Sequence, residues 1–193
     1  MFPDIKFPQA KVDWLIADFV KKDKPSIADF MRLKTIGGLY DRLDRYRAEA
    51  INMSRKDLIG EHHRSSRLAR NMTAAGDPRP SSRCDCHALI SGAHEGSVIL
   101  RAIMAWLLMR IDDPFNGCWL PKDWDDRKYM PNYLRHAVPH CRIHHTEYYN
   151  WLNRRINYLT IKTPEQLINA LRIVRVLLQS GNVPPNVMPK TGR

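Results

Sequence analysis

Apolar residues recur at helical spacing through the first third of the chain. One series, over residues 12–20, ends in a lysine cluster before Pro25, a residue type that helix interiors exclude. Ser26 is a suitable N-cap for a second helix, and the pair Gly37–Gly38 is expected to interrupt that helix. The pattern therefore predicts a helical N-terminal part, with helices over residues 12–20, 27–36, 39–51 and 58–72.

The pattern changes after residue 80. The short apolar runs Cys86–Ile90 and Cys118–Leu120 are typical of two strands, the second returning beside the first. The run Ser97–Met109 has the length and composition of a buried helix. Two amphipathic helices are predicted near the C-terminal end, over His140–Leu159 and over Pro164–Leu178, the latter with proline at its first position. The expected fold class is α+β and predominantly helical.

Composition narrows the class of protein. Hydrophobic residues make up 44% of the 193 residues, which argues against an intrinsically disordered chain. At this length, one domain with a helical arm is expected. Thirty-one Lys and Arg against 20 Asp and Glu give a net charge of +11, which suits a polyanionic partner such as nucleic acid. No stretch predicts a membrane span, and the N-terminus lacks the apolar segment of a Sec signal peptide.

The cysteines do not by themselves indicate a site. Cysteines stand at positions 84, 86, 118 and 141, too few for a disulfide-dense scaffold, and reduced thiols are expected. Cys84 and Cys86 are separated by one residue, whereas the paired cysteines of structural zinc sites usually have roughly two to four residues between them. A zinc site made only of cysteines is therefore disfavoured.

The histidines are the stronger candidates for chemistry. On a helix, His140 and His144 would share one face at the spacing that chelates a single divalent ion. Such a pair alone is more often packing or surface than a metal site. Here it follows a strand histidine, His87, and a turn with Asn116–Gly117 that leads into the second strand. This is the order of a ββα-metal arrangement.

These segments resemble the AHH branch of the HNH nuclease superfamily, found largely as toxin domains of bacterial secreted effectors. The sequence CHALISG at residues 86–92 stands where that family has Ala-His-His followed by apolar residues. The block at residues 112–121 is similar to its Asn-Gly-x-x-Leu-Pro motif, and residues 140–149 are similar to its closing His-x3-His and tyrosine pair. The resemblance implies a ββα-metal nuclease core, a short hairpin plus a helix, surrounded by helices.

The resemblance also divides the chain. Residues 61–181 are expected to form the AHH/HNH-like nuclease domain. Residues 1–60 are expected to be a helical segment that serves delivery or adaptor binding, or caps the nuclease. Residues 182–193 are expected to be a flexible tail.

Particular roles follow from the resemblance. His87, His140 and His144 would hold one divalent metal ion, with Zn²⁺, Ni²⁺, Mg²⁺ and Mn²⁺ left open. Asn116 would fix the general base by a hydrogen bond from its side chain or from the neighbouring backbone. In the family, the second histidine of the pair is the base that deprotonates the attacking water. This chain has Ala88 at that catalytic position, and an alanine cannot accept a proton.

Two explanations of Ala88 stay open. A substitution that silences a toxic nuclease is favoured over a naturally degenerate homologue. A one-residue shift, in which Cys86 binds the metal and His87 is the base, breaks the apolar match and is the minor alternative. Because losing a general base typically costs about 10²- to 10⁴-fold in rate, metal and DNA binding are expected to persist while most cutting is lost.

The implied activity is metal-dependent endonuclease (DNase) hydrolysis of phosphodiester bonds. Four residues are expected to contact the substrate: Arg135, Arg142, His145 and Tyr149. His63 is expected on a solvated helix face. An RNase on the same scaffold and a non-catalytic basic nucleic-acid-binding module are the alternatives.

The family also implies partners and a location. An antibacterial effector of this kind is produced in the bacterial cytoplasm, exported by a specialised secretion system and active in the target-cell cytoplasm. A cognate immunity protein is expected, acidic to complement the charge of +11. A secretion adaptor or chaperone is a further expected partner.

Overall fold

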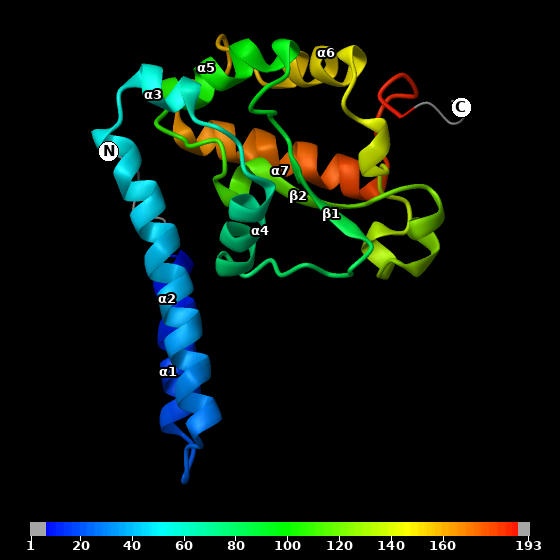
Figure 1. Cartoon of the computed structure of the whole chain (residues 1–193). Helices are drawn as coiled ribbons and strands as arrows, with labels where there is room; N and C mark the ends of the chain where they lie inside the picture. Colours follow the sequence, from blue (N-terminus) through cyan, green and yellow to red (C-terminus); the bar gives the residue numbers. More distant parts are fainter. Residues whose placement is uncertain (1–6, 189–193) are drawn as a thin grey trace.

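The computed structural model describes residues 7–188 of the chain. Its N-terminal part is a hairpin of two helices, α1 (Phe7–Val20) and α2 (Ile27–Glu49), which projects from the rest of the molecule (Figure 1). Ser26 caps α2, because its hydroxyl accepts the Asp29 amide N–H while the Asp29 carboxylate accepts the Ser26 amide N–H. The chain therefore starts with a capped helical arm, as its pattern indicates.

The predicted break inside this arm is wrong. Helix α2 runs without interruption through Gly37 and Gly38. Glycine costs a helix only about 1 kcal/mol relative to alanine, and the residues on both sides favour the helix. Two of the predicted helices are consequently one.

The predicted helix over residues 58–72 is, by contrast, two helices, α3 (Arg55–Gly60) and α4 (Ser65–Ala74). The linker between them is extended at Arg64 (φ −132°, ψ 108°). The amide N–H of Arg64 donates to the buried Asp112 carboxylate at 3.0 Å. Because the Arg64 N–H is bonded to this carboxylate, it is not available for a helical hydrogen bond, and the backbone leaves the helical path.

The two predicted strands form an antiparallel hairpin of β1 (Cys84–Ala88) and β2 (Gly117–Pro121). In its register, His87 lies opposite Cys118 and Ala88 lies opposite Gly117. Side chains alternate between the faces of a strand, so His87 and Ala88 point in opposite directions. The face with Gly117 packs on α4, where an added Cβ would lie 2.5 Å from the Met72 sulfur. The hairpin thus presents His87 away from α4.

Three helices complete the body: α5 (Val98–Trp106), α6 (Thr146–Arg155) and α7 (Pro164–Ser180). Helix α7 begins at Pro164 as predicted, is capped by Thr163 and Gln166, and ends at Gly181 in the left-handed conformation (φ 74°). Shorter 3₁₀ turns occupy Ala50–Asn52, Glu95–Ser97, Pro114–Asn116, Asp125–Tyr129, Asn132–Leu134 and His140–Arg142.

The predicted helix over residues 140–159 needs correction. The chain forms a 3₁₀ turn over His140–Arg142, and α6 begins only at Thr146. His145 is extended (φ −139°, ψ 166°), and its Nε2–H donates to the Val187 carbonyl at 3.1 Å. The contact with the C-terminal segment holds the backbone out of a continuous helix.

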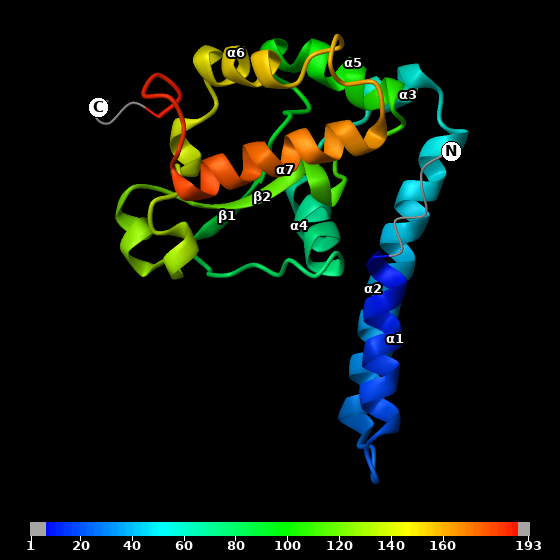
Figure 2. The same ribbon diagram turned by 180° about the vertical axis from the view of Figure 1, so that it is seen from behind.

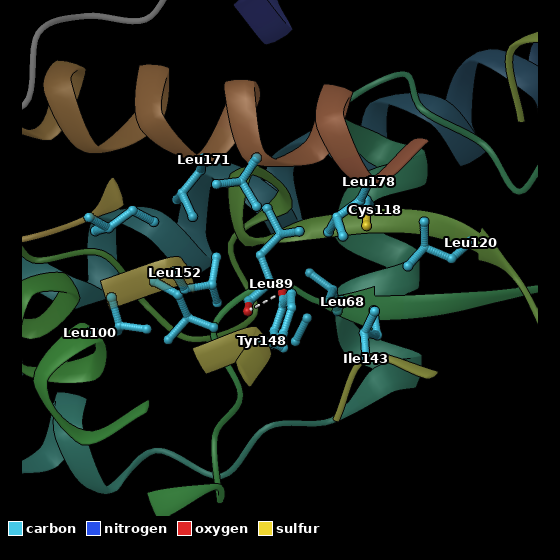
Figure 3. Packing of buried hydrophobic residues seen from close by; sticks show 14 of the residues in the cluster. Leu68, Leu89, Leu100, Cys118, Leu120, Ile143, Tyr148, Leu152, Leu171 and Leu178 are labelled. Carbon is cyan, nitrogen blue, oxygen red and sulfur yellow. Dashed lines mark hydrogen bonds between the residues drawn. The ribbon is translucent and has the colours of Figure 1, made fainter. Parts of the chain in front are cut away.

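The core surrounds the hairpin. Helix α7 covers the hairpin face opposite α4, with Leu178 beside Cys118 (Figure 3), and Figure 2 shows α7 running along β2. Val187 is completely buried in this core. Residues 184–188 therefore do not form a free tail, and residues 189–193 of that predicted tail lie outside the described residues. No helix within residues 7–188 has the length and apolar character needed to cross a membrane.

Candidate metal centre

Three imidazoles from distant parts of the chain meet at one point. His87 comes from β1 and is fully buried, His140 comes from the 3₁₀ turn, and His144 precedes α6. One nitrogen of each ring can be chosen so that all three lie within 4.8 Å of one another. The Nε2 atoms of His140 and His144 are 3.1 Å apart. The two histidines thus converge without the continuous helix predicted for them.

Tyr148 sets the proton position on the His87 ring. Its hydroxyl donates to the Leu89 carbonyl at 2.8 Å (dashed in Figure 3) and accepts the Nε2–H of His87 at 3.0 Å. The other ring nitrogen, Nδ1, is therefore unprotonated, and it has no hydrogen-bond partner within the described residues although it is buried. A buried lone pair without a partner is costly. A metal ion would satisfy it.

The rings of His140 and His144 also have a partner at their second nitrogen. His140 Nδ1 lies 3.1 Å from the Asp85 carboxylate, which accepts the Nδ1–H, while Nε2 is the nitrogen that lies beside His144. His144 Nδ1 lies 3.5 Å from the Tyr149 hydroxyl. Each candidate ligand thus has a second residue that orients its ring, as metal-binding histidines usually do.

The surroundings of His87 and His144 favour the neutral form of both rings. Burial lowers the pKa of His87 well below its ordinary value, and the nearby His140 and His144 lower it further. Burial and the neighbouring His140 lower the pKa of His144 to about 4. Neutral imidazoles offer their lone pairs at pH 7, and three of them suit Zn²⁺, Ni²⁺ and similar borderline ions. The residues present therefore fit a divalent ion held by His87, His140 and His144.

Comparison with known proteins agrees with this geometry. Residues 68–175 match the model of AHH, a nuclease family of the HNH/ENDO VII superfamily with a conserved AHH motif. The chain belongs to this family. No curated protein and no solved structure shows a significant match to the chain. The match confirms the predicted family and the predominantly helical α+β fold, and it supports nuclease activity on a nucleic-acid substrate.

Where the family has a conserved AHH motif, this chain reads Cys86-His87-Ala88, and Ala88 is the residue predicted to stand at the second histidine. Ala88 is 6% exposed and faces α4, on the side of the hairpin opposite His87. Its methyl group can neither accept nor donate a proton. Cys86 points to that same side, with its sulfur 3.5 Å from that of Met72, and burial raises the pKa of its thiol to about 12. Cys86 therefore does not join the imidazoles, and the one-residue shift is disfavoured.

Asn116 of the Asn-Gly motif does not contact the imidazoles. Its side-chain oxygen accepts the Ile90 amide N–H at 2.8 Å, and its side-chain amide donates to the carbonyls of Ile90 and Ile111 at 3.0 and 2.8 Å. Its backbone carbonyl accepts from Leu89. Because position 88 holds alanine, the predicted hydrogen bond from Asn116 to a base has no partner here and stays a prediction. Asn116 instead fastens the segment after β1 to the start of β2.

The predicted substrate contacts divide into two groups. Tyr149 is only 1% exposed and stacks on His94 at 4.0 Å between ring centroids, so it supports His144 and does not line an open groove. His145 uses its Nε2 on the Val187 carbonyl. Arg135 is exposed, and Arg142 is half-buried on the turn that carries His140. The two arginines remain candidates for phosphate contact.

Several roles were not visible in the sequence. Tyr148 reads as a core aromatic, and only the folded chain shows that its hydroxyl orients His87. His63 is not on a solvated helix face: its Nδ1 lies 2.5 Å from the fully buried Asp112 carboxylate. Arg67 binds the same carboxylate at 2.6 Å. The signal that could have indicated this cluster is the acidic pair beside the Asn-Gly motif, since Asp112 needs basic partners if it is buried.

Proposed function

We propose that this AHH-family chain is a metal-dependent DNA endonuclease domain of an antibacterial toxin, with cutting limited by Ala88. The observation that supports this proposal most is the unpartnered, unprotonated Nδ1 of buried His87, in a ring that lies beside the imidazoles of His140 and His144. A core histidine kept for packing alone would have both ring nitrogens satisfied. The net charge of +11 supports a polyanionic substrate.

In this proposal, the chain's own residues bind the metal ion and orient the rings that hold it. His87, His140 and His144 would hold the ion, while Tyr148 and Asp85 fix the ring positions through the nitrogens that face away from it. When bound, a divalent ion stabilises the negative charge that develops on the phosphodiester oxygens. Hydrolysis also requires a proton to leave the attacking water. Ala88 cannot accept it, so the proton must pass to solvent, at a cost of roughly 10²- to 10⁴-fold in rate.

Plasmid cleavage by this chain and by Ala88→His tests the proposal. Each is assayed with EDTA and with added Zn²⁺, Ni²⁺, Mg²⁺ or Mn²⁺, and circular dichroism checks that a histidine at this buried position leaves the fold intact. The expected result is cutting by the Ala88→His variant that EDTA abolishes and that a further His140→Ala change removes. An RNA substrate run in parallel distinguishes DNase from RNase.

A folded, metal-binding Ala88→His variant that leaves both nucleic acids intact would contradict the nuclease proposal. The chain would then be a non-catalytic nucleic-acid-binding module. If Ala88→His unfolds, the unaltered chain is compared with its own histidine variants. Its low residual cutting should depend on His87, His140 and His144. Cutting insensitive to these histidines would contradict the metal site.

The biological setting is part of the proposal. The domain would be made in the bacterial cytoplasm, exported by a specialised secretion system and neutralised in its producer by an acidic immunity protein. The large positive charge supports such a partner. Production of Ala88→His inside bacteria should arrest growth unless the immunity protein is co-produced, whereas production of Ala88→His with His140→Ala should not.

A further inference from the structure

A cavity of about 170 Å³ lies where α2 passes α4, away from the three imidazoles. Six residues line it: Leu39, Arg42, Tyr46, Arg67, Arg70 and Asn71. Three are arginines, and none is acidic. Since α4 packs on the hairpin face opposite His87, the hairpin and α4 separate this cavity from the candidate metal centre.

Two of the arginines have unused donors. Arg42 is exposed and makes no hydrogen bond or ion pair with any residue of the described range 7–188. Arg70 is also exposed, and the bond found for it in that range is a 3.3 Å contact from its Nε to the Ser66 carbonyl of its own helix. Guanidinium groups carry five N–H donors in a planar fork. Both side chains therefore keep donors available to a ligand.

Two of the lining residues, Arg67 and Tyr46, are held in place by contacts with other residues. Arg67 is held by Asp112 at 2.6 Å and by Glu61 at 3.0 Å. The Tyr46 ring is buried between the guanidinium groups of Arg67 and Arg110, at 5.3 and 3.8 Å. Side chains that are already held in place lose less conformational entropy when a ligand binds.

We propose that this cavity binds a backbone phosphate of the nucleic acid, as a second phosphate site apart from the metal centre. Arg67 is neutralised by Asp112 and Glu61, but Arg42 and Arg70 line the same cavity without an ion pair among residues 7–188. Their charge and N–H donors match a phosphate, which takes paired N–H donors. The chain's family membership makes nucleic acid the polyanion to expect. This inference rests on the proposed function and extends its substrate contacts to the arm helix α2.

The test measures binding of a short duplex DNA by fluorescence anisotropy, in EDTA, over a series of salt concentrations. The chain is compared with Arg42→Gln/Arg70→Gln. The matched control, Arg45→Gln/Arg154→Gln, removes two exposed charges that do not line the cavity and make no ion pair among residues 7–188. Neither pair stabilises the fold through an ion pair, so both variants are expected to fold, which circular dichroism verifies.

One lost phosphate contact reduces the slope of log K against log salt by about 1. We expect that reduction, with roughly tenfold weaker binding near physiological salt, for Arg42→Gln/Arg70→Gln and a clearly smaller change for the control. Equal slopes and affinities for the two variants would overturn the second site while leaving the nuclease proposal standing. Failure of the unaltered chain to bind DNA at all would overturn both.

Discussion

At the scale of single residues, the Tyr148 hydroxyl determines which nitrogen of the His87 ring carries the proton. It is the acceptor for Nε2–H and so leaves Nδ1 free. Replacing Tyr148 with Phe removes this acceptor and leaves the Leu89 carbonyl without its donor. We expect Zn²⁺ affinity measured by calorimetry to fall by roughly 10- to 100-fold, the usual effect of losing a partner behind a metal ligand.

The control for that variant is Tyr133→Phe, which removes the hydroxyl of an exposed tyrosine that takes part in none of these bonds. Its Zn²⁺ affinity should match that of the unaltered chain. Unchanged affinity in a folded Tyr148→Phe protein would show that the hydroxyl does not orient His87.

The metal-free protein should lose stability when it is acidified. The pKa values of His87 and His144 are lowered in the folded state, whereas the unfolded chain titrates near the ordinary histidine value of 6.5. The unfolded state therefore binds more protons below that pH, and the free energy of unfolding falls between about pH 6.5 and pH 4. Asp112 adds to the loss only at lower pH, because its pKa lies below the ordinary 3.8.

Urea midpoints at pH 7.5 and pH 5, both in EDTA, check this dependence. The midpoint should be lower at pH 5, and the difference should shrink in His144→Gln, which cannot titrate. A midpoint that rises on acidification would show that these rings are not held neutral.

The sequence identifies the residues that could bind metal but not those that support them. The spacing of His140 and His144, together with a strand histidine, is a local pattern. The roles of Tyr148 and Asp85 depend on which atoms face each other across segments that are distant in sequence. Asn116 was found through its motif, yet its bonds to Ile90 and Ile111 exist only in the folded hairpin.

At the scale of elements, capping signals are dependable and glycine signals depend on context. Ser26 and Thr163 begin helices where the sequence predicts. Gly37 and Gly38 interrupt nothing, while Gly181 ends α7 with a positive φ. Glycine ends one helix and not the other because, of these three glycines, only Gly181 occupies a backbone conformation that other residues avoid.

Alanine substitutions should separate these cases. Gly37→Ala and Gly38→Ala meet open space, so each should stabilise the protein by about 0.5–1 kcal/mol through helix propensity. Gly181→Ala should destabilise it by more than about 1 kcal/mol, because its Cβ would lie 2.1 Å from the His136 carbonyl oxygen. Thermal unfolding measures all three, and a stabilised Gly181→Ala would show that the helix end can relax.

At the scale of the whole molecule, buried acidic residues join the arm to the body. Asp112 binds His63, Arg67 and the Arg64 amide, while the neighbouring Asp113 binds Arg47 of α2 at 2.7 Å. This network crosses the predicted boundary at residue 60. It connects the helical arm to the loop that leads into Asn116 and β2.

Asp112→Asn tests how much the network contributes. The variant keeps the shape of the side chain but removes the fully buried charge that pairs with Arg67, which keeps only Glu61 as its counter-charge, so a loss of about 3 kcal/mol in unfolding free energy is expected. Asp125→Asn, on an exposed 3₁₀ turn, should change stability by less than about 0.5 kcal/mol. Equal effects of the two changes in urea unfolding would mean that the Asp112 carboxylate contributes little to stability.

The three imidazoles also belong to the whole molecule, since they join β1 to a turn more than fifty residues later. The four cysteines are all free thiols, so an ion held by these rings would be the chain's removable cross-link, closing a long loop of polypeptide. Its contribution follows mass action: at a free concentration one hundred times Kd, about 2.7 kcal/mol is added to the unfolding free energy. The melting temperature of this protein would then report the free metal concentration of its surroundings.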